Sequence, residues 1–154
     1  MSLNKGDLIP DISLLDQNDL EVAFRSYKGK NVVVYFYPKD FTPGCTKEAC
    51  SFRDNYSRIE SFGAEVIGIS GDSPESHRKF AKAYRLSYTI LTDSKQKAEK
   101  AFGVKRNLFG LLPGRETFIF DKENKLLGKF SSQLAAEKHV DEAIRILEKH
   151  SQGK

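Results

Sequence analysis

Residues 31–37 read Asn-Val-Val-Val-Tyr-Phe-Tyr, an unbroken run of β-branched and aromatic side chains after the first residue. A strand with one solvated face alternates apolar and polar residues, whereas a strand covered on both faces is apolar throughout. The run therefore predicts a central strand of a sheet. Such a strand needs a packed layer on each side, so the remaining segments have to cover both faces.

The segments around this strand alternate between strand-like and helix-like patterns. Alternating apolar residues predict strands, apolar residues spaced three to four apart predict helices, and Gly, Pro, Asn and Asp mark the turns. We expect hairpins from 11–15 with 21–24 and from 116–120 with 126–130, strands at 65–70 and 88–91, helices at 43–62, 74–84, 94–102 and 135–149, and an irregular segment at 104–114. This order predicts an α/β protein with a central mixed sheet flanked by helices, and it fits a thioredoxin-like fold with an added N-terminal β-hairpin.

The chain has 154 residues, of which 39% are hydrophobic and 30% charged. This is enough for one well-covered core, so we expect a single domain over residues 1–154. Uncharged apolar stretches reach only about seven residues, far below the roughly 20 that span a bilayer, and no signal-peptide region is visible. With only two cysteines, the composition predicts a soluble protein of a reducing compartment, without a membrane span.

The charge and the histidines exclude two other classes of site. The 25 Lys and Arg residues are interleaved with 21 Asp and Glu residues, so the net charge of +4 forms no basic stripe for nucleic acid. His77, His139 and His150 are far apart and form no ligand pair. We therefore expect no nucleic-acid partner and no metal, with all three histidines facing solvent on helices.

The two cysteines, Cys45 and Cys50, lie where the central strand is followed by a helix. Thr42 and Pro43 fit the N-cap and the first helical position, which puts Cys45 in the first turn. Unpaired backbone N–H groups and the positive end of the helix dipole favour a thiolate over a thiol at such a position. The sequence therefore predicts a reactive cysteine, with a small buried core residue as the alternative.

Cys50 lies on the same predicted helix but faces another direction. At 100° per residue, the two side chains point about 140° apart, and their Cα atoms stand roughly 8 to 9 Å apart. A disulfide needs Cα atoms about 4.4 to 6.8 Å apart. A bond between Cys45 and Cys50 therefore requires this part of the helix to unwind, which is typical of a redox switch and not of a structural crosslink.

Several motifs along the chain resemble the peroxiredoxin family, in particular its peroxiredoxin Q subgroup, also called bacterioferritin comigratory protein. The matching segments are Tyr37-Pro38, Thr42-Pro43-Gly44-Cys45-Thr46, Glu48-Ala49-Cys50, Phe52-Arg53-Asp54, Gly68-Ile69-Ser70-Gly71-Asp72-Ser73, Phe102-Gly103-Val104, Leu112-Pro113-Gly114-Arg115-Glu116-Thr117-Phe118 and Glu137-Lys138-His139-Val140-Asp141-Glu142. The resemblance implies a thioredoxin-fold peroxidase that reduces hydrogen peroxide and organic hydroperoxides with a thiol donor, usually thioredoxin. It implies no metal and no organic cofactor.

The resemblance also assigns roles to five residues. Cys45 corresponds to the peroxidatic cysteine, Cys50 to the resolving cysteine and Arg115 to the distal arginine, and the pocket of Cys45 includes Thr42 and Pro38. The corresponding hypothesis is that Cys45 attacks a peroxide oxygen while Arg115 stabilises the developing charge. Because the resolving thiol lies in the same chain, we expect a monomer. The compartment implied is a bacterial cytoplasm or, alternatively, a plastid after removal of a transit peptide.

The two cysteines also fit other functions. A dithiol redox sensor or binding module would use the same two cysteines without turnover, whereas a thioredoxin-type disulfide reductase is disfavoured because Cys-x-x-Cys spacing is absent. Phe109, Leu111 and Leu112 interrupt a polar segment. They fit either local packing or an apolar rim that docks the reductant. Glu48 and Arg53 receive no role.

Overall fold

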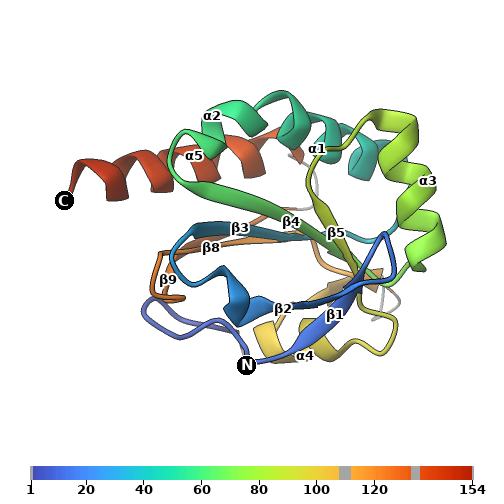
Figure 1. Ribbon diagram of the computed structural model, residues 1–154, viewed down its shortest axis with the longest axis horizontal. Helices are drawn as coiled ribbons and strands as arrows, with labels where there is room; N and C mark the ends of the chain where they lie inside the picture. The colour runs from blue at the N-terminus through green and yellow to red at the C-terminus, as the bar shows by residue number, and fades with distance from the viewer. Residues whose placement is uncertain (1, 108–111, 133–135, 154) are drawn as a thin grey trace.

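The computed structural model describes residues 2–107, 112–132 and 136–153, and it consists of a mixed sheet with helices on both faces (Figure 1). The described strands of the main sheet are β1 (Ser13–Asp16), β2 (Glu21–Ala23), β3 (Asn31–Phe36), β4 (Ala64–Ser70), β5 (Thr89–Thr92), β8 (Glu116–Phe120) and β9 (Leu126–Ser131). Their order is β2-β1-β5-β4-β3-β8-β9. The helices are η1 (Phe24–Tyr27), α1 (Pro43–Asp54), α2 (Tyr56–Glu60), α3 (Pro74–Tyr84), α4 (Lys97–Phe102) and α5 (Ala136–Gln152).

The central position of β3 is confirmed. All six of its residues are buried, and the strand pairs in parallel with β4 and antiparallel with β8. Val33 and Tyr35 pack in the core beneath α1 and α5, whereas Val32 and Val34 pack in a second core on the α4 and η1 side. The apolar run follows from this arrangement, because successive side chains of a strand point to opposite faces and here both faces are covered.

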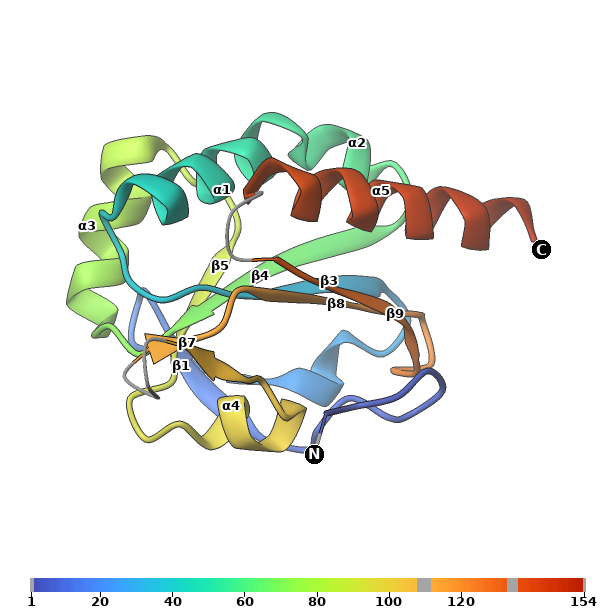
Figure 2. The ribbon, with the colours of Figure 1, turned by 180° about the vertical axis from the view of Figure 1, so that it is seen from behind.

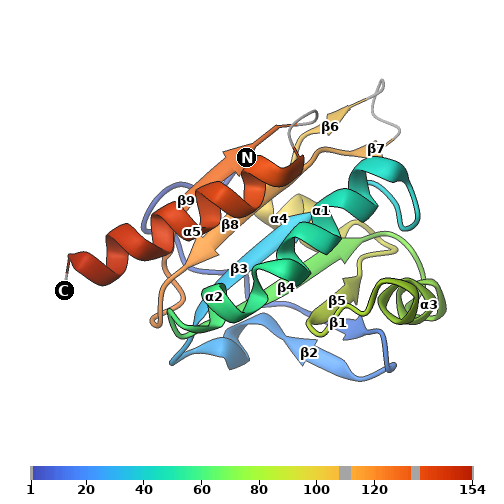
Figure 3. The same cartoon turned by 90° about the horizontal axis from the view of Figure 1, so that it is seen from above.

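Helices α1, α2 and α5 cover one face of the sheet, and α4 lies on the other (Figure 2). α1 and α5 lie side by side above β3, β8 and β9, as Figure 3 shows from above. The N-terminal hairpin of β1 and β2 extends the sheet at one edge, where β1 pairs antiparallel with β5. The predicted thioredoxin-like architecture with an N-terminal β-hairpin is thereby confirmed.

The structure differs from the sequence prediction in two places. The helix expected to run from residue 43 to about 62 is divided at Asn55, whose side-chain Nδ2 donates to the Ser51 carbonyl oxygen at 2.9 Å. The Asn55 backbone, with φ −105° and ψ 7°, departs from the helical conformation, and hydrophobic periodicity does not report such a local change. The segment expected to be irregular contains a short antiparallel ladder of β6 (Arg106–Asn107) and β7 (Leu112–Pro113).

In the part of the chain that the structure describes, every helix is too short or too polar to cross a membrane.

Candidate active site

Cys45 and Arg115 meet at the carboxyl end of β3, where the chain continues into α1. β8 runs antiparallel to β3, and its register pairs Glu116 with Phe36. Arg115 directly precedes β8 and therefore lies at the same edge of the sheet as the start of α1. Open α/β sheets bind ligands at this edge. The register thus brings Arg115 to Cys45, although the two residues are 70 positions apart in the chain.

Cys45 lies in the first turn of α1 and is almost completely buried, with 1% of its surface exposed. Pro43 is the first residue of the helix, and Thr42 has the extended backbone of an N-cap, with φ −80° and ψ 150°. The predicted start of the helix is therefore confirmed. The N–H groups of the first turn and the helix dipole favour a negative charge on the Cys45 sulfur.

The side chain of Thr42 does not cap the helix. Its hydroxyl donates to the carbonyl oxygen of Lys39 at 2.8 Å, and it makes no hydrogen bond to the first turn of α1. Only the backbone of Thr42 matches the predicted N-cap. Because the single hydroxyl proton is donated to Lys39, the lone pairs of the Thr42 oxygen remain able to accept a hydrogen bond from a substrate.

Arg115 joins the thiol of Cys45 to a buried carboxylate. Its Nη2 donates to Cys45 Sγ at 3.4 Å, and its Nη1 donates to Glu48 Oε1 at 2.6 Å. The Arg115 side chain is only 7% exposed, so its charge acts on the sulfur with little screening by water. Among the described residues, Arg115 Nε–H has no acceptor. The guanidinium therefore stabilises a thiolate and keeps one donor unused.

Gly44 permits the close approach of Arg115 to Cys45. A Cβ added at position 44 would lie 3.1 Å from Arg115 Nη2, which is tighter than ordinary van der Waals contact. The guanidinium is held from its other side by Glu48 and has little freedom to move away. Glycine at position 44 leaves room for the Arg115 guanidinium, and the backbone conformation alone does not call for it.

We expect the Gly44→Ala variant to react with hydrogen peroxide roughly tenfold more slowly, because small misplacements of a catalytic group have effects of this size. The measurement is the second-order rate constant of Cys45 oxidation. Gly71→Ala is a matched control, since a Cβ at position 71 meets its nearest atom, the Asp93 carbonyl oxygen, at an ordinary 3.8 Å. Equal rates in both variants would contradict the explanation.

Glu48 belongs to the site although the sequence analysis gives it no role. It lies three residues after Cys45, and this spacing places two residues on one helix face, so the signal was present in the sequence. The carboxylate is fully buried, with Oε2 lying 3.6 Å from Nδ1 of His139. Burial raises the pKa of Glu48 to about 8, although the neighbouring Arg115 acts in the opposite direction.

His139, on α5, faces Glu48 as a neutral ring. Its Nε2 lies 2.9 Å from the Ser132 carbonyl oxygen, and its Nδ1 lies 2.7 Å from the Thr117 hydroxyl oxygen. A carbonyl only accepts, so Nε2 carries the hydrogen and Nδ1 accepts from Thr117. Burial lowers the pKa of His139 to about 4, and the positive charge of Arg115 contributes to the shift. The ring therefore adds no positive charge to the site near neutral pH.

The raised pKa of Glu48 predicts a pH-dependent effect of the Glu48→Gln substitution on stability. The unfolded chain releases the Glu48 proton near pH 4.5, whereas the folded chain keeps it up to about pH 8. Wild-type stability therefore falls as the pH rises through this window, while glutamine does not titrate. We expect the free energy of unfolding of Glu48→Gln, relative to that of the wild type, to increase as the pH rises from about 5 to 8.

Urea unfolding at a series of pH values measures this difference. Glu142→Gln is the matched control, because a hydrogen bond from Arg145 lowers the pKa of the partly buried Glu142 and confines its titration to lower pH. The difference between Glu142→Gln and the wild type should stay constant over the same window. A constant difference for Glu48→Gln as well would show that Glu48 is ionised throughout.

Cys50 lies on the same unbroken helix as Cys45, and both thiols are free. The Cys50 side chain is half-buried. Beside it, the Tyr88 hydroxyl donates to the Ala49 carbonyl oxygen at 3.0 Å and ties this turn of α1 to the sheet. The structure thus brings Cys45 and Arg115 into direct contact, whereas Cys50 belongs to a neighbouring turn.

Pro38 lines a hollow of about 170 Å³ beside the site. The hollow is bounded by Phe36, Ser70, Asp93 and Arg106 among others, and neither Cys45 nor Thr42 contributes to its wall. Pro38 begins the loop that leads to Thr42, so its position is compatible with shaping that loop.

The prediction that all histidines face solvent is wrong for two of the three. His77 and His139 are fully buried, and His150 is half-buried. Both ring nitrogens of His77 have partners, namely Asp40 Oδ2 at 2.7 Å and the Leu91 carbonyl oxygen at 3.1 Å. Because the nitrogens of both buried rings are paired in this way, burial leaves no ring nitrogen without a partner.

The sequence leaves two roles for Phe109, Leu111 and Leu112, namely local packing and docking of the reductant. Phe109 and Leu111 lie outside the described residues. Leu112 pairs through its backbone with Asn107 in the β6–β7 ladder.

Comparison with known proteins gives a consistent result. A family model described as the AhpC/TSA family matches residues 5–128. A protein of Gentiana triflora named "Peroxiredoxin Q, chloroplastic" is 50% identical over 146 residues, which cover 95% of this chain and 67% of the relative. The Arabidopsis thaliana protein of the same name is 51% identical over 145 residues, covering 94% and 67% respectively.

Solved structures agree with the sequence relatives. The crystal structure of peroxidoxin BcpB from Mycobacterium tuberculosis is 37% identical, with a TM-score of 0.87 over 94% of this chain and 96% of that one. A structure of the Xanthomonas campestris bacterioferritin comigratory protein, determined for insight into its alkyl peroxide reduction activity, is 28% identical, with a TM-score of 0.85 and the same coverage. The chain therefore belongs to the AhpC/TSA family and, within it, to the peroxiredoxin Q group of thiol-dependent peroxidases.

Proposed function

We propose that Cys45 is the peroxidatic cysteine and Cys50 the resolving cysteine of this peroxidase, with hydrogen peroxide and organic hydroperoxides as substrates. The observation that carries the proposal is the 3.4 Å contact between Arg115 Nη2 and Cys45 Sγ in the first turn of α1. A buried arginine and a helix N-terminus both favour the thiolate, which is the nucleophilic form of cysteine. Rapid-quench measurement of Cys45 oxidation by peroxide tests the assignment.

In the first step, the Cys45 thiolate attacks one peroxide oxygen. A sulfur–oxygen bond forms, the oxygen–oxygen bond breaks, and the leaving oxygen departs as hydroxide or alkoxide and takes up a proton. Arg115 and the N–H groups of the first turn are preorganised to stabilise charge on that oxygen. The Thr42 oxygen, whose proton is donated to Lys39, accepts a hydrogen bond from the peroxide O–H. Pro38 shapes the loop that carries Thr42.

In the second step, the Cys50 thiol attacks the sulfenic acid of Cys45, which gives a disulfide and water. Both cysteines lie on one continuous helix, where residues five apart have Cα atoms roughly 8 to 9 Å apart. This separation exceeds the span of a disulfide, about 4.4 to 6.8 Å. The turns between Cys45 and Cys50 therefore unwind before the bond forms.

Hydrogen exchange tests this unwinding. We expect backbone amides between Cys45 and Asp54 to lose protection in the disulfide form, because local unfolding breaks their helical hydrogen bonds. Amides of β3 serve as the internal reference. Cys50→Ser, treated with peroxide in the same way, is the control because it cannot form the bond. Identical exchange over Cys45–Asp54 in both redox states of the wild type would rule out the unwinding.

An external dithiol then attacks the disulfide and restores both thiols. We propose thioredoxin, or a similar dithiol protein, as this reductant. The alternative, a redox sensor that transmits oxidation to a partner, also uses the Cys45–Cys50 disulfide. Sustained peroxide consumption with thioredoxin and its reductase supports the enzyme, whereas a single stoichiometric oxidation supports the sensor.

We further propose that the protein acts as a monomer in a reducing compartment. An intramolecular disulfide between Cys45 and Cys50 needs no second chain, which supports the monomer. The bacterial cytoplasm and the plastid are the two compartments considered, and the chloroplastic relatives support the plastid. Sedimentation analysis of the reduced and disulfide forms tests the oligomeric state.

A further inference from the structure

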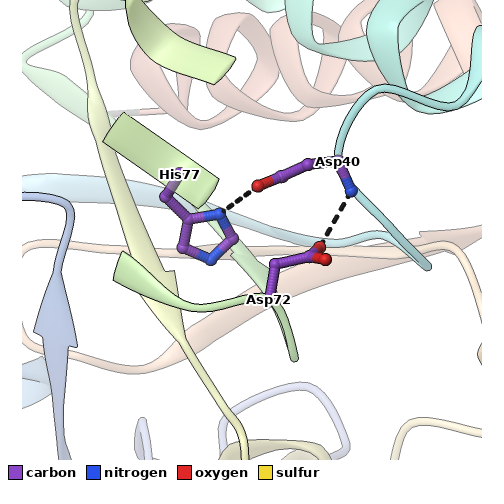
Figure 4. Close-up of side chains that lie close together, drawn as sticks. All are labelled: Asp40, Asp72 and His77. Atoms are coloured by element: carbon purple, nitrogen blue, oxygen red, sulfur yellow. Dashed lines mark hydrogen bonds and ion pairs between the residues drawn. The ribbon is translucent and has the colours of Figure 1, made fainter. Parts of the chain in front are cut away.

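A second cluster of polar side chains, two of them buried, lies at the loop that precedes α1. Asp40 belongs to this loop, Asp72 follows β4, and His77 lies on α3 (Figure 4). The side chains of His77 and Asp40 are 0% and 1% exposed. None of these residues contacts Cys45 or Arg115 through a side-chain hydrogen bond recorded in the described structure. The cluster is therefore separate from the hydrogen bonds that join Cys45 and Arg115.

The ligand atoms of Asp40, Asp72 and His77 lie within 4.8 Å of one another, as they do in metal sites. Protein donors, however, already occupy these atoms. Asp40 Oδ1 accepts from the Tyr37 hydroxyl at 2.5 Å, Asp40 Oδ2 accepts from the Ser76 hydroxyl at 2.9 Å, and Asp72 Oδ2 accepts from the Ser70 hydroxyl at 2.7 Å. A metal ion would have to displace these bonds, so the geometry favours a hydrogen-bonded function.

His77 is held at both ring nitrogens. Its Nε2 lies 3.1 Å from the Leu91 carbonyl oxygen, and its Nδ1 lies 2.7 Å from Asp40 Oδ2. A carbonyl oxygen only accepts, so Nε2 carries a hydrogen. The two contacts hold the ring between β5 and the loop before α1, and they tie Asp40 to α3.

Asp40 is fixed through its backbone as well as its side chain. Its N–H donates to Asp72 Oδ2 at 2.8 Å. The next residue, Phe41, has a left-handed backbone with φ 65°, which is strained for an aromatic residue. Thr42, the N-cap of α1, follows directly. Asp40 is firmly held, Phe41 is strained, and the segment that carries Cys45 begins with the next residue, Thr42.

We propose that the Asp40–His77 pair is the fixed pivot of the segment that unwinds during each catalytic cycle. This inference rests on the proposed Cys45–Cys50 disulfide. Residues 38–40 stay in place while residues 41–50 rearrange, and the strained Phe41 is the hinge. When the disulfide is reduced, Thr42 and Cys45 return to their positions relative to Arg115. His77 is therefore a positioning residue, which acts on the site through Asp40.

The first test is hydrogen exchange at the Asp40 amide in both redox states, measured by NMR. A fixed pivot predicts that the Asp40 N–H remains protected in the disulfide form, while amides from Thr46 to Cys50 lose protection. Loss of protection at Asp40 together with those amides would overturn the proposal, because the unwinding would then extend through the pivot.

The second test compares variants by the rate constant of Cys45 oxidation with hydrogen peroxide. We expect His77→Ala and Asp40→Ala to react between about tenfold and a hundredfold more slowly, because Thr42 and Cys45 lose their alignment. Asp40→Asn should retain a rate within about threefold of the wild type, since its side-chain amide N–H donates to His77 Nδ1 and keeps the contact. This rescue separates positioning through the pair from a general loss of side-chain volume.

A control for stability is available in the second core. Leu126→Ala removes a buried side chain of β9, 2% exposed and far from the loop in the fold, and destabilises the protein without touching the pivot. Equal rates in Leu126→Ala and His77→Ala, or no rescue by Asp40→Asn, would overturn the inference. If wild-type Cys45 itself failed to react with peroxide, the proposed function would fail instead.

Discussion

The Arg115→Ala variant should react with hydrogen peroxide at least about a hundredfold more slowly than the wild type. Arg115 is the buried cation in contact with Cys45 Sγ, and removal of a preorganised donor from a developing oxyanion costs about 10²- to 10³-fold. The substitution removes both the stabilisation of the thiolate and the donor aimed at the leaving oxygen. The measurement is the second-order rate constant of Cys45 oxidation under single-turnover conditions.

Two controls separate chemistry from folding. Arg115→Ala leaves the buried Glu48 side chain without its hydrogen-bond partner and, at alkaline pH, without its counter-charge. The Glu48→Gln/Arg115→Ala double variant should therefore be more stable than Arg115→Ala at alkaline pH, while its rate stays low. Arg106→Ala breaks a comparable arginine–glutamate pair, with Glu99, outside the Cys45 cluster. It should leave the rate constant nearly unchanged. A near-normal rate in Arg115→Ala would refute the role of this arginine.

The Cys50→Ser variant should lose sustained turnover while keeping the first chemical step. Cys50 has no part in the attack on peroxide, so the rate constant of Cys45 oxidation should stay within about twofold of the wild type. Without the resolving thiol, the sulfenic acid persists and excess peroxide oxidises it further. Steady-state peroxide consumption with a thioredoxin system should therefore fall to a few per cent or less.

Ser51→Ala is the matched control for Cys50→Ser, because it truncates the adjacent residue of α1 without removing a thiol. It should retain turnover. Full turnover in Cys50→Ser would mean that the external reductant resolves the sulfenic acid directly. In that case the unwinding of α1 would not be part of the cycle.

Much of the fold follows from local patterns. The apolar run of β3 indicates burial on both faces, and Ser73-Pro74 marks the start of α3, where the Ser73 side chain accepts from the Ser76 N–H. These features depend on nearby residues alone. The break at Asn55 is different, because it depends on the backbone conformation of one residue, and the apolar periodicity continues through it.

The site is predictable in part. Pro43 marks the start of α1 and so places Cys45 in the first turn of that helix. Arg115 lies 70 positions further along the chain, and its approach to Cys45 depends on the β3–β8 register. Local sequence patterns do not predict this register, and only the family resemblance indicates the contact. The burial of His139 and His77 is indicated by their positions on the apolar stripes of two helices. His139 lies four residues before Ala143 on the buried stripe of α5, and His77 lies three residues before Phe80 on α3.

The most direct test of the central claim is the intact mass of the reduced protein after one equivalent of hydrogen peroxide, with alkylation of the remaining thiols. Peroxidatic and resolving roles for Cys45 and Cys50 predict the loss of two hydrogens and of both alkylation sites in the wild type. They also predict a sulfenic or further oxidised Cys45 in Cys50→Ser. An unchanged mass with two alkylated thiols would contradict the account.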